Sequence, residues 1–318
     1  MIVAEMLLFA GSSHPALAKA LAKELEQELG DITVKRFSCG ECYVKYEQSV
    51  RGKDVYIMQA PGRNPDEHLM ELLFLCQAAK LSFARSVHVL LPHFPYARQD
   101  RVSHPREGIS AKLVATMLEQ AGAEHVITLS LHSDQIQGFF SIPVDVLHTF
   151  SVFAEEFRRR KVLSPVVVSP DIGGAKQAKK FADDIGADLA IMHKSRSGHH
   201  QAEILEVVGD VKGRQCILYD DMIDTAGTIV GAVQALRERG ADDTIFIAAT
   251  HAVFSGAARE RLASCGPVDV IVTDSIPTQS MPNLTVLPIA PLLAEVIRHI
   301  ESGQSVTDIY KKTSVDGL

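Results

Sequence analysis

The chain has 318 residues, of which 46% are hydrophobic and 22% charged, and its formal net charge is −7. This length and apolar content suffice for two cores, whereas the acidic balance argues against a general nucleic-acid-binding protein, which would have a basic excess. The five cysteines, an odd number, favour a reducing cytoplasm, and the apolar start contains Glu5 and is too short to span a bilayer, so we expect a first strand and no membrane partner.

Strands and helices are predicted to alternate through the first half of the chain. Amphipathic segments typical of helices begin after loops marked by glycine, serine or proline, and Pro15 and Gly30 mark the start and end of the first helix. The predicted strands are residues 6–13, 53–62, 86–94 and 125–132, and the predicted helices are residues 14–30, 66–83 and 111–123.

The second half repeats this order. Its predicted strands are residues 164–170, 189–195, 216–221, 243–251 and 268–277, and its predicted helices are residues 175–187 and 229–241. Such alternation indicates an α/β fold in which helices cover parallel sheets on both faces. We predict two doubly wound domains, residues 1–147 and 148–318, with ligands bound outside the carboxyl ends of the strands. The C-terminal segment is expected to pack back on the N-terminal domain.

The strand at 216–221 ends in two aspartates, and small and hydroxyl residues separate it from the next helix. Backbone N–H groups in such a run converge on an anion, which predicts a phosphate cradle. Adjacent carboxylates would repel a bare phosphate but accept hydrogen bonds from vicinal sugar hydroxyls, so the predicted ligand is a sugar phosphate. The alternative is an ordinary acidic turn with a threonine cap. The predicted residues are Asp220, Asp221, Asp224, Thr225, Ala226, Gly227 and Thr228.

Other loops contain residues suited to phosphates or to a metal ion. Arg98 lies in "FPYARQDR", where its guanidinium could bind phosphate oxygens or belong to a solvated face. His132 and Asp171 each follow a predicted strand and could share a divalent cation such as magnesium; the alternative for His132 is a structural role. Gly173 and Gly174 would let the backbone approach phosphates closely.

The segment "MHKSRSGHHQAE", residues 192–203, is too polar to pack in a core. Lys194 and Arg196 stand on either side of a serine at its start. The segment is predicted to be a mobile loop with two cationic side chains, and the alternative is a basic surface loop without a ligand.

These segments resemble those of the ribose-phosphate diphosphokinases. "ILYDDMIDTAGTI" is similar to a loop that this family shares with type I phosphoribosyltransferases, whereas "FSCGE", "YARQDR", "LHSDQIQGFF" and "SPDIGGAKQAKKFAD" are similar to the diphosphokinases alone. The resemblance covers nearly the whole chain, with the family's order and spacing. It implies two domains of the type I phosphoribosyltransferase kind and a reaction that transfers the β,γ-diphosphoryl group of ATP to the 1-hydroxyl of ribose 5-phosphate.

The resemblance also implies a role for each candidate residue. The hairpin with Phe37 and Glu41 would reach into the ATP site of a neighbouring subunit, in a cytoplasmic, dimer-based assembly that is a hexamer in the family. The implied positions are Arg98 and Gln99 with Phe37 and Glu41 for ATP, His132 and Asp171 for Mg²⁺, Asp171, Gly173 and Gly174 for the diphosphate loop, and Lys194 and Arg196 for catalysis.

The chain departs from the family pattern at three positions. Cys39 replaces an acid in the adenine-binding hairpin, and Ile172 replaces a histidine in the diphosphate loop. Many members also have a site for activating phosphate and inhibitory ADP; Ser49 and Arg51 match parts of it, but Phe83 stands where a small hydroxyl residue is common. Two other functions stay open at this point: a phosphoribosyltransferase that consumes the product, and a non-catalytic regulatory relative.

Overall fold

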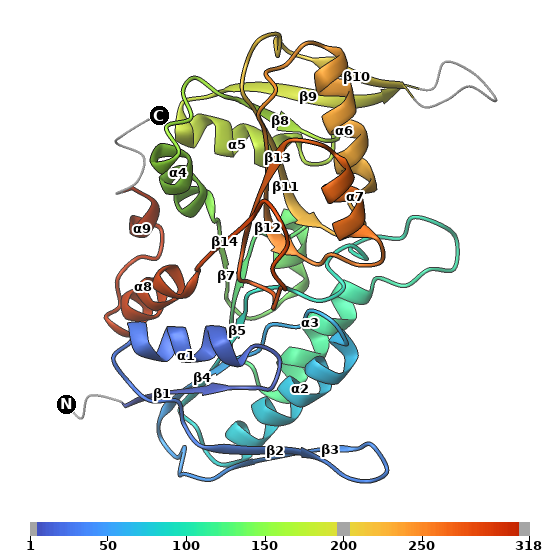
Figure 1. Ribbon diagram of the computed structural model, residues 1–318. Helices are drawn as coiled ribbons and strands as arrows, with labels where there is room; N and C mark the ends of the chain where they lie inside the picture. Colours follow the sequence, from blue (N-terminus) through green and yellow to red (C-terminus); the bar gives the residue numbers. More distant parts are fainter. Residues whose placement is uncertain (1–4, 196–203, 312–318) are drawn as a thin grey trace. The chain divides into compact units, whose positions relative to one another are not determined.

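The computed structural model describes residues 5–195 and 204–311 (Figure 1). The chain divides into two compact units. The first unit contains the chain up to His148 together with Ser275–Pro277 and Ile289–Val306, and the second contains Thr149–Asp274, Thr278–Pro288 and the chain from Thr307 onward. Within the described residues, no helix combines the length and the apolar character that a membrane crossing requires.

The first unit is built on a five-stranded sheet in which every paired strand is parallel to its neighbour. All five residues of its second strand are buried, as expected for a sheet covered on both faces. In spatial order the strands are β1 (Met6–Ala10), β4 (Asp54–Met58), β5 (Ser86–Leu91), β6 (His125–Leu129) and β7 (Val144–Leu147).

Helices from distant parts of the sequence cover this sheet (Figure 1). One face packs against α2 (Pro65–Leu81) and α3 (Ser110–Ala121), and an antiparallel hairpin of β2 (Ile32–Arg36) and β3 (Cys42–Tyr46) packs against α2. The other face is covered by α1 (Pro15–Glu24) and α8 (Ala290–Glu301). The 3-10 helix η1 (Asp134–Phe139) lies between β6 and β7 in the chain.

The second unit has a seven-stranded sheet whose winding reverses direction. From β8 the chain moves outward to β9 and β10 on one side, and from β11 it moves to β12, β13 and β14 on the other. Among the described strands of this sheet, β10 alone is antiparallel to its neighbour. In spatial order the strands are β10 (Ile204–Val208), β9 (Asp188–Ser195), β8 (Val166–Ser169), β11 (Cys216–Ile223), β12 (Ile245–Ala252), β13 (Val268–Thr273) and β14 (Leu284–Leu287).

Two apolar cores lie on the two faces of this second sheet. Alternate residues of each strand point to opposite faces, so Ile217 joins the core with the phenylalanines of α4 and α5, whereas Leu218 joins the core under α6 and α7. The helices of the second unit are α4 (Phe150–Arg159), α5 (Ala175–Ile185), α6 (Gly227–Glu238), α7 (Ala258–Ser264) and α9 (Asp308–Lys311).

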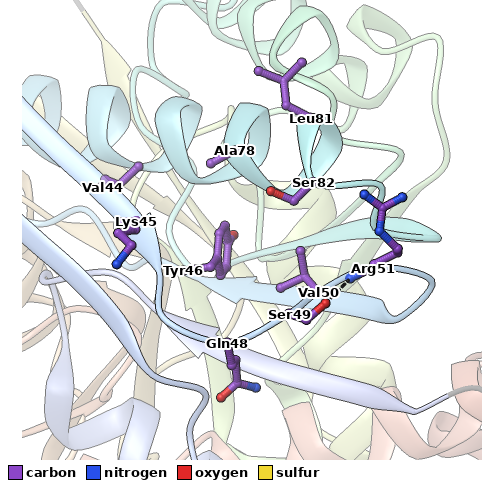
Figure 2. Close-up of a pocket in the computed structure, with 10 residues that line it drawn as sticks. All are labelled: Val44, Lys45, Tyr46, Gln48, Ser49, Val50, Arg51, Ala78, Leu81 and Ser82. Atoms are coloured by element: carbon purple, nitrogen blue, oxygen red, sulfur yellow. Dashed lines mark hydrogen bonds between the residues drawn. The ribbon is translucent and has the colours of Figure 1, made fainter.

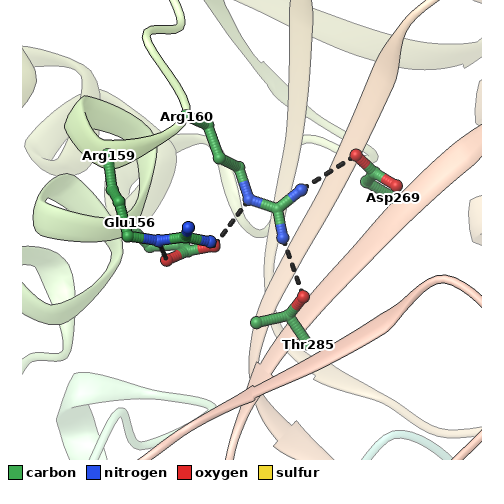
Figure 3. Close-up of polar contacts among 5 residues, drawn as sticks. All are labelled: Glu156, Arg159, Arg160, Asp269 and Thr285. Atoms are coloured by element: carbon green, nitrogen blue, oxygen red, sulfur yellow. Dashed lines mark hydrogen bonds and ion pairs between the residues drawn. The ribbon is translucent and has the colours of Figure 1, made fainter.

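A polar cluster anchors α4 to the sheet of the second unit (Figure 3). Glu156 accepts hydrogen bonds from both Arg159 and Arg160, and these bonds lower its pKa to about 2. Arg160 extends further, to Asp269 of β13 at 2.9 Å and to Thr285 of β14 at 2.7 Å. One guanidinium thus connects the end of α4 to two neighbouring strands.

The α/β class with parallel sheets and helices on both faces is confirmed. In the second unit the winding reverses between β8 and β11. In the first unit the strand order runs in one direction, and α8, from a distant part of the chain, covers one face of the sheet. Among the elements that the sequence analysis missed are helices α4, α7 and α8 and the edge strands β7, β10 and β14.

Candidate functional site

The reversal between β8 and β11 positions the main candidate site. The two strands are parallel neighbours, with Val166 opposite Cys216 and Val168 opposite Leu218. The loop that follows β8 and the turn that follows β11 therefore leave the same edge of the sheet, next to each other. A crevice outside the strand ends is the usual ligand position at such a switch point.

The acid pair lies inside β11, close to its carboxyl end. The N–H of Asp221 donates to Oδ1 of Asp220 at 2.9 Å. Burial raises the pKa of Asp220 well above its usual range, and the negative charges of Asp221 and Asp171 raise it further. The negative charge near this strand edge suits a cation or hydroxyl donors and not an unaccompanied anion.

The turn after β11 presents the start of a helix. Ala226 has φ 60° and ψ 8°, the left-handed region, and α6 begins at Gly227. The first N–H groups of any helix have no partner within the helix, and no described side chain caps this start of α6. These N–H groups can therefore donate to a ligand. An ordinary threonine-capped turn, the alternative from the sequence, is not what forms here. Thr225, Gly227 and Thr228 are exposed, while the Ala226 methyl group is buried.

The loop after β8 is a tight turn around Asp171. The N–H of Gly174 donates to Oδ1 of Asp171 at 2.8 Å, and the Ser169 hydroxyl donates to the Asp171 carbonyl at 2.7 Å. A Cβ atom on Gly173 would lie 3.2 Å from Asp171 Oδ1, and one on Gly174 would lie 3.1 Å from Ser169 Oγ. A side chain at either glycine would therefore make an unusually tight contact in this turn. Ile172, which lies between Asp171 and Gly173, is 61% exposed.

Two predicted site regions lie at the carboxyl edge of the first unit's sheet. Arg98 and Gln99 follow β5, and His132 follows the neighbouring strand β6. Arg98 and His132 are exposed. Gln99 is held at the start of α3, because its Oε1 accepts from the Ser110 hydroxyl at 2.5 Å.

The tip of the β2–β3 hairpin contains Phe37 and Glu41. The N–H of Phe37 donates to the Glu41 carbonyl at 2.9 Å, and the Phe37 ring packs edge-on against Tyr43 with centroids 5.7 Å apart. The Phe37 ring is nevertheless 46% exposed. Cys39, in the same turn, is exposed and free.

A separate pocket lies where the hairpin meets α2, and Figure 2 shows its lining. Ser49 and Arg51 line it, but none of the predicted substrate or metal residues does. The Arg51 guanidinium lies 4.6 Å from the centroid of the Phe83 ring. The aromatic ring at position 83 thus engages the arginine that the resemblance assigned to a regulatory site.

Some predicted residues have little or no structural description. Lys194 lies in β9, opposite Leu205 of β10, but its side chain is not described, and Arg196 lies outside the described residues. In residues 5–195 and 204–311, no three histidine, cysteine or acidic side chains group as a metal site would need. Magnesium often uses only one or two carboxylates, with water and substrate phosphates as its other ligands, so the acidic strand edge still suits it.

Sequence reasoning missed two side chains that contact the 224–228 turn although they lie far from it in the sequence. The Ser255 hydroxyl donates to Asp224 Oδ1, and the Arg261 guanidinium donates to the Thr225 carbonyl at 2.7 Å. Both residues come from the segment after β12, which neighbours β11. The available signal was "FSGAARER" at the carboxyl end of a predicted strand, where loops of this fold class bind ligands.

Comparisons with known proteins show the family of this chain. Residues 6–122 match the family described as the N-terminal domain of ribose phosphate pyrophosphokinase, and residues 198–311 match the phosphoribosyl synthetase-associated domain. The ribose-phosphate pyrophosphokinase of Corynebacterium efficiens is 47% identical over 96% of each chain, and that of Helicobacter hepaticus is 46% identical over 95% of this chain and 98% of its own. The crystal structure of phosphoribosylpyrophosphate synthetase from Mycobacterium smegmatis superposes with a TM-score of 0.88 and 45% identity, over 94% of this chain and 99% of that one. The chain belongs to the ribose-phosphate pyrophosphokinase family.

Proposed function

We propose that this protein transfers the β,γ-diphosphoryl group of ATP to the 1-hydroxyl of ribose 5-phosphate, giving 5-phosphoribosyl 1-diphosphate and AMP. The observation that supports this most directly is the pairing, on one strand end, of two carboxylates with an uncapped helix start. The first binds vicinal hydroxyls and the second binds a phosphate, which are the two ends of one sugar phosphate. Family membership favours this reaction over a phosphoribosyltransferase or a non-catalytic relative.

In this proposal Asp220 and Asp221 accept hydrogen bonds from the ribose hydroxyls. The N–H groups at the start of α6 and the hydroxyls of Thr225 and Thr228 hold the 5-phosphate. The sugar is then fixed at both ends, so its 1-hydroxyl is oriented for in-line attack on the β-phosphorus. Such positioning contributes more to diphosphoryl transfer than a strong base does.

ATP binding is proposed to use residues of the first unit. Arg98 would bind phosphate oxygens, Gln99 would donate its amide, and the exposed Phe37 ring of a neighbouring subunit would stack on adenine, with Glu41 accepting from the exocyclic amine. Asp171 and His132 are each proposed as a ligand of Mg²⁺, which would neutralise charge on the triphosphate. Magnesium prefers oxygen ligands and keeps several waters, so the Asp171 carboxylate suits it together with water and phosphate oxygens.

Lys194 and Arg196 are proposed as the catalytic cations. The test is AMP formation from ATP, ribose 5-phosphate and magnesium by the wild type and by Lys194→Ala and Arg196→Ala. An interaction made mainly in the transition state lowers kcat and leaves binding unchanged, so each variant should lose about 10²–10³-fold in kcat with wild-type Michaelis constants.

The control is Lys179→Ala, which removes a lysine paired with Asp183 on the surface of α5 and should keep full activity. ADP in place of AMP would indicate an ordinary kinase, and no turnover by the wild type would indicate a non-catalytic relative. Wild-type kcat in Lys194→Ala would show that the segment is only a basic surface loop.

The protein is also proposed to self-associate, as a dimer-based hexamer in the cytoplasm. The exposed hairpin tip, which would complete a neighbour's ATP site, supports the self-association. The five cysteines, all of which are free, support the cytoplasmic location. Light scattering at assay concentration should find an oligomer. A fully active monomer would contradict the shared site.

A further inference from the structure

The turn that begins α6 has a backbone conformation that needs support. Ala226 has a positive φ of 60° although it is not glycine, and the left-handed region is unfavourable for a residue with a Cβ atom. Such a conformation persists only where contacts with the surrounding structure stabilise it. Two residues after β12 contact the turn at the two positions that precede Ala226.

Ser255 binds Asp224 through both its backbone and its side chain. Its N–H donates to the Asp224 carbonyl at 3.0 Å, and its hydroxyl donates to Asp224 Oδ1. A further backbone bond, from the Phe254 N–H to the Ile223 carbonyl at 3.0 Å, continues the pairing of the two segments. Asp224 is therefore fixed in position and in side-chain direction.

Arg261 determines the direction of the next peptide group. Its Nη1 donates to the Thr225 carbonyl at 2.7 Å. The described chain contains no cis peptide bond, and in a planar trans peptide the C=O and the following N–H point in opposite directions. The N–H of Ala226 therefore faces away from Arg261. A charge-assisted bond to the carbonyl also polarises the same peptide and strengthens its N–H as a donor.

We propose that Ser255 and Arg261 are positioning residues that hold the 224–228 turn in its anion-binding conformation before the sugar phosphate binds. They act through Asp224 and Thr225 and do not need to touch the substrate. This inference rests on the proposed function of the turn as the 5-phosphate cradle. Without either residue, the substrate has to order the turn itself, so its binding weakens.

The test is calorimetric binding of ribose 5-phosphate, and separately of ATP with magnesium, to wild type, Arg261→Gln and Ser255→Ala. Each variant should bind ribose 5-phosphate roughly 10-fold more weakly or worse, the size expected for losing a hydrogen bond that involves a charged group, while binding ATP as wild type. Ser255→Thr keeps the hydroxyl at an exposed position and should restore wild-type binding.

A matched control separates positioning from general stability. Arg237 on α6 also donates its guanidinium to loop carbonyls, those of Cys265 and Pro267. Arg237→Gln loses the same kind of bond in the same unit, so a comparable fall in melting temperature is expected with no loss of ribose 5-phosphate affinity. If Arg261→Gln does not fold, the contrast between Ser255→Ala and Ser255→Thr decides the matter.

The possible outcomes are distinct. Wild-type affinity in Arg261→Gln and Ser255→Ala, with a wild type that forms AMP, would overturn the positioning role and leave the proposed function standing. Equal losses for ATP and ribose 5-phosphate would also overturn it, because the turn would then be only a structural element. A wild type that neither binds ribose 5-phosphate nor forms AMP would overturn the proposed function and the inference together.

Discussion

Asp220 and Asp221 are neighbours in the chain, yet their surroundings differ. Asp220 is desolvated at the strand edge and accepts the N–H of Asp221 at 2.9 Å. Replacing Asp220 would also remove this backbone hydrogen bond. We therefore expect Asp221 to be the variant position at which the loss of sugar binding is easiest to interpret.

Asp221→Ala should weaken ribose 5-phosphate binding roughly 10- to 100-fold, because hydrogen bonds to a charged group contribute about 1.5–3 kcal/mol. ATP binding should stay close to wild type, since the proposed nucleotide residues lie in the first unit. The measurement is the dissociation constant of each substrate by calorimetry. Asp242→Ala is the control, because Asp242 accepts the nearby Thr244 N–H ahead of β12, away from the acid pair. Equal losses for both substrates in Asp221→Ala would refute the assignment.

At the residue scale, site residues that are contiguous in the sequence could be predicted. The Asp-Asp pair and the small residues from Asp224 to Thr228 are contiguous, so their chemistry could be inferred without a fold. Ser255 and Arg261 could not be inferred in this way, because their bonds to the turn span 31 and 36 residues. These contacts depend on the pairing of β11 with β12 and on where α7 lies.

At the scale of elements, the amino ends of four parallel strands of the first unit share a chain of hydrogen bonds. Ser86 donates to Asp54 at 2.5 Å and contacts His88 Nε2 at 2.8 Å. His88 Nδ1 lies 3.1 Å from His125 Nδ1, and His125 Nε2 lies 3.1 Å from Asp145. Both ends are carboxylates, which only accept.

The donor and acceptor roles along this chain restrict the protonation of His88. The Ser86 hydroxyl donates its one proton to Asp54, so Nε2 of His88 donates to the Ser86 oxygen and Nδ1 of His88 accepts from His125. A second proton on His88 would place two N–H groups against each other, so His88 stays neutral.

This arrangement predicts a loss of stability in acid. Burial lowers the pKa of His88 to about 4, and the neighbouring His125 lowers it further; Glu124 raises it in part, and Arg85 makes the smallest contribution, which lowers it. An unfolded histidine has a pKa of about 6.5, so the unfolded state binds more protons between these values. The contribution is present above pH 6.5 and is lost as the pH falls toward 4. At about 1.4 kcal/mol per pKa unit, the full loss is on the order of 3 kcal/mol.

Chemical unfolding at several pH values checks this expectation. His88→Gln, which cannot gain a charge, should flatten the fall in unfolding free energy between neutral pH and pH 4. His193→Gln is the control, because it removes an exposed imidazole of β9 that lies outside this chain of hydrogen bonds, and the fall in unfolding free energy should remain. The same acid slope in His88→Gln and wild type would show that His88 does not titrate as described.

The missed elements differ in how visible they are in the sequence. Helices α4 and α8 do have N-terminal signals, Thr149 before α4 and Pro291 in the first turn of α8, so local pattern alone could have predicted them. β14 has four residues and β10 is an antiparallel edge strand, and short edge strands have weak patterns.

At the scale of the whole molecule, the first unit depends on the end of the chain. The hydroxyl of Tyr56, stacked on His88 in the sheet, donates to Glu301 of α8 at 2.8 Å, and Arg298 of α8 donates to the Glu24 carbonyl at the end of α1. These contacts span 245 and 274 residues. Local sequence patterns do not predict contacts between residues so far apart in the chain. The first unit is therefore made of separate stretches of the chain and not of one continuous segment.

Removing α8 should therefore unfold the first unit. Its buried face includes Leu292, Leu293, Val296 and Ile297, and burying side chains of this kind contributes about 1.5–3 kcal/mol each. Their sum, roughly 6–12 kcal/mol, approaches the entire stability of a typical protein, about 5–15 kcal/mol. In a chain that ends at Pro288, the amides of β4 should lose their protection from hydrogen exchange. A chain that ends at Val306 keeps α8 and should retain that protection, which makes it the matched control. Full protection of β4 in the shorter chain would mean that residues before His148 form a stable sheet on their own and that α8 is only an accessory cover.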